Sequence, residues 1–283
     1  MKRYEIVLGA SFIATVALVA GTSYISASLS FRPIGDPATR QRLFELIQPV
    51  AIMNCDLKRF GEPNDGGYAL CANLLSFSQG AYSYGISGYD GWGCDVSTAI
   101  KAKVHQYDCF DTRQPACPSG EPVFHAECVA ASSVTDNGKV FDSIDSQITR
   151  NGDAGKNLVV KMDVEGAEWD SLLGASESTL SRIDQLAIEF HYVGDPKFVK
   201  VLERLKQHFY VAHLHFNNFS CRTGIEPFPA LAYEVLFVSK RLTSLASAGT
   251  PPGLSAFDAP NDPTSPDCQP TSGGSKHPQS QSK

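Results

Sequence analysis

Residues 158–169 read LVVKMDVEGAEW, an apolar run that stops on two alternate carboxylates and a glycine before helix-forming residues follow. A run of this kind is typical of a strand that is buried on both faces of a parallel sheet. In open α/β sheets, ligands bind just beyond the carboxyl ends of such strands. Asp163 and Glu165 therefore stand at a position where a ligand is expected.

Strand-like and helix-like segments alternate on both sides of this stretch. Apolar runs predict a short strand at 68–71 and seven core strands, at residues 81–86, 104–107, 123–126, 158–162, 185–190, 210–216 and 233–238. Helical spacing predicts helices at residues 39–47, 95–103, 143–150, 168–173 and 196–207. The alternation predicts an α/β fold with a Rossmann-like, doubly wound, mainly parallel seven-stranded sheet. Because no long helix follows the sixth core strand, we expect the last strand to insert antiparallel as part of a hairpin.

The two ends of the chain differ from this α/β segment. Residues 1–30 place Lys2 and Arg3 before an apolar stretch, which predicts a cleaved signal peptide or a signal-anchor helix. Either alternative leaves the basic flank in the cytoplasm and exports the rest, so we expect a secreted or single-pass membrane protein. The α/β domain is expected over residues 31–245, and the Pro-, Ser- and Gly-rich residues 246–283 are expected to form a disordered tail.

Composition narrows the class of protein. Hydrophobic residues make up 42% and charged residues 19% of the chain, which suits a globular domain, and the formal charge of −6 argues against a nucleic-acid-binding surface. All eight cysteines follow the apolar N-terminal stretch, which permits disulfides in an exported protein. Cys109 and Cys117, on either side of a proline-containing loop, are the favoured local pair. No cysteine or histidine spacing matches a zinc site, so no metal is expected.

A glycine-containing loop follows the first core strand, in the run YSYGISGYDGWG at residues 82–93. Tyr84, Gly85, Ser87 and Gly88 are candidates for ligand contact, because glycines let the backbone approach a ligand closely. An ordinary glycine-rich turn is the alternative interpretation.

The second core strand ends on Asp108. A carboxylate at this place can accept hydrogen bonds from both ribose hydroxyls of a nucleoside. Asp111 is the competing candidate, and capping of a turn is the structural alternative.

Asp163, Glu165 and His191 are the candidate catalytic residues. In an extended strand, Asp163 and Glu165 would point to one face about 7 Å apart, which suits a general base or a shared cation. Capping of the next helix is the alternative. His191 and Glu189 share a face at the end of the fifth core strand, and a histidine there can take a hydroxyl proton near neutral pH.

Two other patterns carry less information. His213 and His215 alternate on a later strand and could bind a metal, but the sequence offers them no third ligand. Asn218 begins a single glycosylation sequon.

Several segments, in this order, resemble the FkbM-like class of S-adenosylmethionine-dependent methyltransferases, and particularly the subgroup related to methyltransferase-like protein 24. They lie at residues 59–68, 82–86, 104–108, 161–169 and 185–191, and the resemblance spans about residues 55–240. It implies a class I methyltransferase fold, S-adenosylmethionine as the cofactor, and methylation of a hydroxyl on a sugar or related small acceptor. It further implies that the Gly85 loop lies against the methionine end of the cofactor and that Asp108 holds the ribose. Asp163, which is also expected to contact the cofactor, and Glu165 would border the reaction centre.

The sequence therefore predicts an exported methyltransferase in which Asp163 or His191 removes the proton of the acceptor hydroxyl. We expect a small-molecule or glycan acceptor, no nucleic acid, and membrane contact only through the N-terminal segment. One alternative is a glycosyltransferase with a type II anchor that binds a divalent metal at Asp163 and Glu165. A second is a catalytically silent, secreted binding module that retains the fold.

Overall fold

The computed structural model describes residues 34–247 and 258–268. The seven predicted core strands are all present in this part of the chain. Their bounds are β3 (Gly80–Tyr84), β4 (Lys103–Tyr107), β5 (Glu121–His125), β9 (Leu158–Met162), β10 (Ile183–His191), β11 (Phe209–Phe216) and β12 (Ala232–Ser239).

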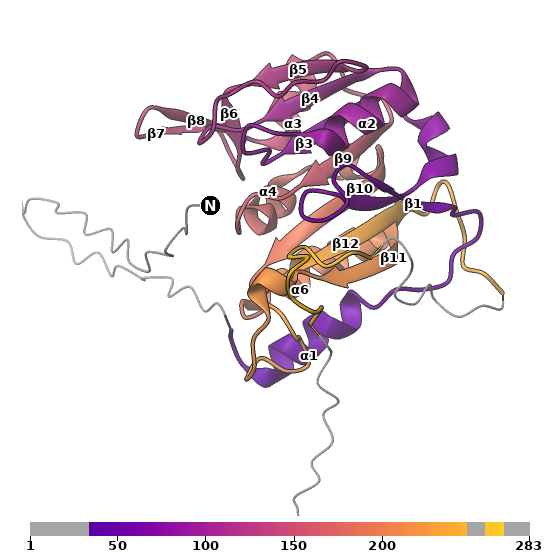
Figure 1. Cartoon of the computed structure of the whole chain (residues 1–283), viewed down its shortest axis with the longest axis vertical. Coiled ribbons are helices and arrows are strands. Elements are labelled where there is room, and N and C mark those ends of the chain that lie inside the picture. The colour runs from indigo at the N-terminus through magenta and orange to yellow at the C-terminus, as the bar shows by residue number, and fades with distance from the viewer. Residues whose placement is uncertain (1–33, 248–257, 269–283) are drawn as a thin grey trace, which may run out of the picture. The chain divides into compact units, whose positions relative to one another are not determined.

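These strands form one mixed sheet in the order β11-β12-β10-β9-β3-β4-β5 (Figure 1). Neighbouring strands pair in parallel except β12, which lies antiparallel between β10 and β11. The expected antiparallel insertion of the last strand is therefore confirmed. The result is a mixed α/β fold with a large, mostly parallel sheet, consistent with a Rossmann-like methyltransferase fold.

The five predicted helices are present, with their ends shifted by a few residues. In the described residues the helices are α1 (Pro37–Leu46), α2 (Gly91–Ile100), α3 (Ile144–Arg150), α4 (Glu168–Gly174), the unpredicted α5 (Glu177–Leu180) and α6 (Pro196–His208). Several begin at a side-chain cap, as when Asp90 accepts a hydrogen bond from the Gly93 amide. Proline at the first position of α6 follows the cap Asp195, whose carboxylate accepts from the Lys197 amide.

The sheet is covered on both faces. Along β9, Leu158, Val160 and Met162 pack into the core formed with α1 and α3–α6, whereas Val159 packs on the opposite side with α2 and the strand β2 (Tyr68–Cys71). This alternation is the period of two expected of a strand. Lys161 follows Val159 on that second face, so a buried charge stands at the carboxyl end of an otherwise apolar strand.

Two small sheets flank the large one. The hairpin of β1 (Leu57–Phe60) and β2 packs near β10 and β12, and a three-stranded sheet contains β6 (Glu127–Val129), β7 (Val134–Asp136) and β8 (Lys139–Asp142). Of these strands only β2 is predicted from the sequence, because its four residues are all buried whereas the others include exposed or half-buried positions.

The described residues contain four disulfides, which indicate an oxidising, exported compartment. The predicted Cys109–Cys117 bridge is wrong. Cys109 follows β4 and pairs with Cys128 on the adjacent β6, while Cys117 pairs with Cys94 on α2. The other two bridges are Cys55–Cys71 and Cys221–Cys268. Within residues 34–247 and 258–268, no helix is long and apolar enough to cross a membrane, and the predicted signal or anchor at residues 1–30 lies outside this part of the chain.

The predicted disordered tail needs a correction at residues 258–268, which pack on the domain (Figure 1, yellow). We call this segment the strap. It is tied to the domain by the Cys221–Cys268 disulfide, and the Asn261 amide donates to both Asp65 and Glu234. Composition misses the strap because its attachment is covalent and polar rather than hydrophobic.

Candidate functional site

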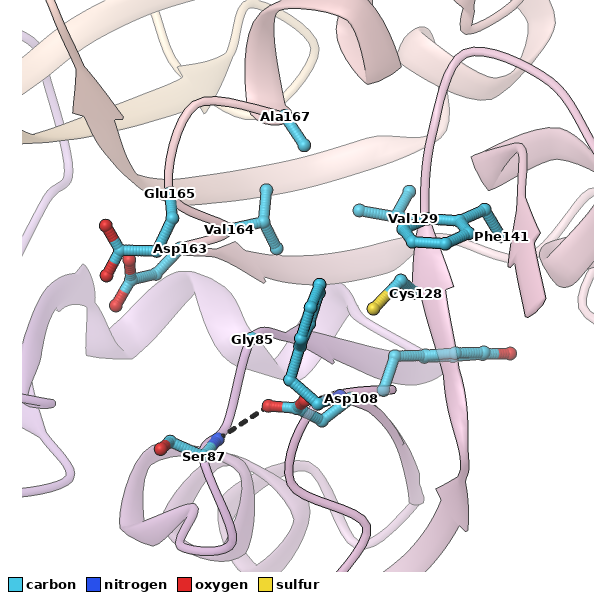
Figure 2. A pocket seen from close by; sticks show the side chains of 12 residues that line it. Gly85, Ser87, Asp108, Cys128, Val129, Phe141, Asp163, Val164, Glu165 and Ala167 are labelled. Carbon is cyan, nitrogen blue, oxygen red and sulfur yellow. Dashed lines mark hydrogen bonds between the residues drawn. The ribbon is translucent and has the colours of Figure 1, made fainter. Parts of the chain in front are cut away.

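A cavity of about 410 Å³ opens at the carboxyl ends of β3, β4 and β9 (Figure 2). Its walls come from the loops after these strands and from β6 and β8. The volume falls in the range of ~300–1,000 Å³ that is usual for small-molecule sites. The place is where an open α/β sheet binds its ligand.

The lining of this cavity divides by polarity. Phe110, Val129 and Phe141 supply the apolar wall of the lining. In Figure 2 the carboxylates of Asp163 and Glu165 lie across the cavity from Val129 and Phe141. Among the 12 described residues that line the cavity, three are carboxylates and none is lysine, arginine or histidine. Such a lining favours a ligand that combines a flat apolar part with positive charge.

The loop after β3 reaches the cavity through Gly85 and Ser87. Gly85 has φ +73°, and a Cβ at this position would stand 1.6 Å from the carbonyl oxygen of Asp163. The amide of Gly85 donates to the carbonyl of Tyr107, and the Lys161 amine donates to the Gly85 carbonyl at 2.6 Å. Glycine is therefore required here because the loop is pressed against the end of β9.

Of the four residues predicted to contact a ligand in this loop, Gly85 and Ser87 line the cavity and Tyr84 and Gly88 do not. The Tyr84 ring is fully buried and stacks on Tyr82 and Tyr107 in the core. Gly88 lies farther along the loop, where an added Cβ would meet the side chains of Asp111 and Arg113.

Asp108 lines the cavity, but its carboxylate is engaged by the protein itself. Oδ2 accepts from the amides of Ile86 and Ser87 (the latter dashed in Figure 2), and Oδ1 accepts from the amides of Phe110 and Asp111. A carboxylate has about four lone-pair positions, and these four donors use them. Asp108 therefore joins the loops after β3 and β4, and the geometry does not favour the predicted role of holding a ribose.

Asp163 and Glu165 behave differently from each other. Glu165 has φ +55° and an 87% exposed side chain. The expectation that Asp163 and Glu165 continue the strand in extended form is therefore wrong. Asp163 is held from one side, because its Oδ2 accepts from the Tyr68 hydroxyl at 3.0 Å and lies 3.7 Å from Lys161 Nζ. Helix α4 has Ala167 at its N-cap, so neither carboxylate caps it.

His191 is positioned by a buried carboxylate that the sequence analysis passes over. Glu168 is fully buried, and its Oε1 accepts from the His191 amide at 2.7 Å and lies 3.1 Å from His191 Nδ1. Burial alone would lower the pKa of His191, but the hydrogen bond and charge of Glu168 outweigh it, and the pKa is raised. The residue is the second glutamate of the VEGAE motif, so its spacing from Glu165 is the signal that could have identified it.

The other ring nitrogen of His191, Nε2, faces a set of carboxylates. It lies 3.4 Å from Glu165 Oε2, 3.5 Å from Glu189 Oε1 and 4.0 Å from Asp163 Oδ1. Glu189 is buried, and burial together with the charges of Asp163 and Glu234 raises its pKa well above the ordinary value. The structure thus brings the three predicted catalytic residues together, although His191 lies outside the cavity lining.

His213 and His215 belong to the contacts of the strap. His213 Nε2 lies 2.7 Å from Asp258, and His215 Nε2 lies 3.4 Å from Asp267. Both acids lie in the segment expected to be disordered, which is why the sequence pattern offers these histidines no partner.

Asn218, the first residue of the sequon, is buried. Its amide donates to strap carbonyls, including that of Asp262, and its oxygen accepts from the Asp262 amide. A glycan on this side chain would displace the strap.

Comparison with solved structures gives distant likenesses, one of which is described below. No family model and no curated protein matches the sequence. A crystal structure of methyltransferase FkbM from Methylobacillus flagellatus KT aligns with a TM-score of 0.36 and 15% sequence identity, over 57% of this chain and 43% of that chain. The chain thus spans less than half of that protein. Because the TM-score is low, the description of the fold rests on the strand order given above and not on this likeness.

Proposed function

We propose that the protein is an S-adenosylmethionine-dependent methyltransferase that methylates a hydroxyl on a sugar or related small acceptor in an exported compartment. The observation that carries the proposal is the lining of the cavity, with three carboxylates and no basic side chain among its described residues. S-adenosylmethionine carries a sulfonium and an ammonium against one carboxylate, so its net charge complements this lining. A sugar nucleotide would instead place its anionic diphosphate beside the three acids.

The cavity also suits the parts of this cofactor. The apolar wall of Phe110, Val129 and Phe141 can contact a flat purine, and Asp163 and Glu165 stand where a positive methionine end would be stabilised. When bound, the cofactor supplies an activated methyl group. The protein then has to align an acceptor hydroxyl with it and accept the hydroxyl proton. Asp163 borders the cavity and His191 does not, so Asp163 is the better placed of the two to accept that proton.

A binding screen tests this proposal. Thermal unfolding would be followed with S-adenosylmethionine, with its demethylated product and with sugar nucleotides, each with and without Mn²⁺. A ligand that binds only the native state raises the unfolding temperature by mass action. We expect a rise with S-adenosylmethionine, and a smaller rise with the demethylated product because it lacks the sulfonium charge.

A substitution then locates the binding site. The side chain of Ala167 borders the cavity (Figure 2), so Ala167→Trp should fill it and abolish the stabilisation. Ala126→Trp, at an exposed position outside the cavity lining, serves as the matched control and should leave binding intact. Stabilisation by a sugar nucleotide with Mn²⁺, and none by S-adenosylmethionine, would replace the methyltransferase by the glycosyltransferase alternative. Stabilisation by neither would favour a silent binding module.

A further inference from the structure

Three side chains at the edge of the cavity are arranged like the ligands of a metal ion. One donor atom each of Asp163, Glu189 and His191 can be chosen so that all lie within 4.8 Å of one another. We propose that they bind one divalent transition-metal cation, of the Mn²⁺ or Zn²⁺ type. The pattern of the sequence predicts no metal, because the three ligands come from two strands whose adjacency is a property of the fold.

The distances between the donor atoms support a cation between them. His191 Nε2 lies 3.5 Å from Glu189 Oε1 and 4.0 Å from Asp163 Oδ1, which is long for direct hydrogen bonds. Ligands about 2.1 Å from a shared ion stand about 3.0–3.4 Å apart when adjacent and about 4.2 Å apart when opposite. The observed separations therefore fit a cation with small movements of the side chains.

Each of the three ligands is held from outside by another side chain. His191 Nδ1 faces the buried Glu168 at 3.1 Å, which leaves Nε2 directed at the carboxylates of Asp163, Glu189 and the exposed Glu165. The Tyr68 hydroxyl donates to Asp163 Oδ2, and the Asn217 amide donates to Glu189 Oε1. Ligands oriented by such outer partners are characteristic of metal sites, and a carboxylate behind a ligating histidine is the commonest arrangement.

The charge of the surroundings is also suitable. Lys161 lies 3.7 Å from Asp163 Oδ2, whereas two further acids, Asp65 and Glu234, lie close enough to act on Glu189. The lysine amine is also anchored to the Gly85 carbonyl, which keeps it on the Oδ2 side of Asp163. The mixture of one imidazole with carboxylates favours a first-row transition ion over Ca²⁺ or Mg²⁺.

If the proposed methyltransferase function holds, this cation would also take part in the reaction by coordinating the acceptor hydroxyl. Asp163 belongs both to the proposed metal triad (Asp163, Glu189 and His191) and to the cavity lining. The ion would therefore stand where an acceptor hydroxyl approaches the cofactor. A bound cation lowers the pKa of a coordinated hydroxyl and orients it. Cation binding itself does not depend on that function.

The test measures binding of the metal alone. The untagged, chelator-treated protein would be titrated with MnCl₂ and, separately, ZnCl₂, followed by calorimetry and by electron paramagnetic resonance for Mn²⁺. All described cysteines are in disulfides, so thiolates do not compete for Zn²⁺. We expect one site per chain, with nitrogen coupling from His191 in the Mn²⁺ spectrum.

Variants separate the triad from its acidic surroundings. Glu189→Gln should weaken binding at least tenfold and His191→Gln should remove the nitrogen coupling, whereas Asp170→Asn, in an exposed ion pair with Lys197, should change affinity less than threefold. If Glu189→Gln does not fold, Tyr68→Phe removes only one outer hydrogen bond and should still weaken binding about tenfold. Absence of a site up to 1 mM of either ion, on the order of the weakest extracellular sites, or equal affinity in a folded Glu189→Gln protein, would overturn the inference. Cation binding without any response to S-adenosylmethionine would keep it and reject the methyltransferase.

Discussion

Replacing Glu168 by glutamine should destabilise the protein although the two side chains have the same shape. Glu168 is fully buried, and each of its oxygens accepts a hydrogen bond from a backbone amide. Oε1 accepts from His191 at 2.7 Å and Oε2 accepts from Gly166 at 2.8 Å. Glutamine has only one acceptor oxygen, so one of these amides must face the NH₂ group of the new side chain.

The expected cost follows from this single mismatch. A buried donor that loses its acceptor costs about 1–3 kcal/mol, and hydrogen bonds to a charged group contribute about twice as much as neutral ones. We expect a loss of about 2–3 kcal/mol in the free energy of unfolding. With a slope of about 2 kcal/mol per molar urea, the unfolding midpoint should fall by about 1 M.

Urea unfolding with the disulfides intact measures this cost. Trp169 stacks between Phe190 and Phe198 next to the substituted residue, so its fluorescence reports on the same region. Asp170→Asn is the matched control, because its carboxylate is 54% exposed and pairs only with Lys197 at the surface; it should cost less than about 0.5 kcal/mol. A Glu168→Gln protein within 0.5 kcal/mol of the parent would refute the role given to Glu168.

Three further outcomes can be checked in the same way. Burial lowers the pKa of His105 from 6.5 to about 4, so the free energy of unfolding should fall by up to about 3 kcal/mol as the pH falls from 6.5 towards 4. In urea titrations across this range, His105→Gln should make the free energy of unfolding depend less on pH, and an unchanged dependence would contradict this. Gly85→Ala should lose at least about 2 kcal/mol and any cofactor stabilisation, because its Cβ would overlap the Asp163 carbonyl at a positive φ; a protein of parental stability would show that the loop is not pressed against β9. Replacing Cys221 and Cys268 together by serine should lower the free energy of unfolding by about 2–4 kcal/mol, measured by urea unfolding, and a smaller loss would mean that the strap is held mainly by its polar contacts.

The sequence predicts the large sheet well because each of its strands can be recognised separately from its own apolar run. Each core strand is a buried run such as Leu158–Met162, and the last strand without a preceding long helix indicates the antiparallel insertion. Strands β6, β7 and β8 escape prediction because each has at most four residues and is partly exposed. The strap escapes for a different reason, since its order depends on a disulfide and on polar contacts between distant parts of the chain.

The candidate site is predicted in position but only partly in role. Asp163 and His191 are brought together as expected, because β9 and β10 are parallel neighbours. The four amides that donate to Asp108 could not be predicted, since a strand-end carboxylate satisfied by backbone amides cannot be told from a free one by its sequence. Glu168 is missed because two of its partners are backbone amides and the third is the ring of His191 on another strand, so only its place in the VEGAE motif marks it in the sequence.

Two buried acids face each other across the pairing of β10 and β12. Glu189 of β10 lies directly opposite Glu234 of β12, and like charges in that relation destabilise a sheet. Both are buried, the amides of Asn217 and Asn261 donate to them, and His191 and His215 each lie 3.5 Å from one of them. A fold selected for stability alone would place apolar residues at these two positions. Local rules are broken in this way mainly at functional sites, so the acidic pair is itself an argument that this edge binds a positively charged ligand or ion.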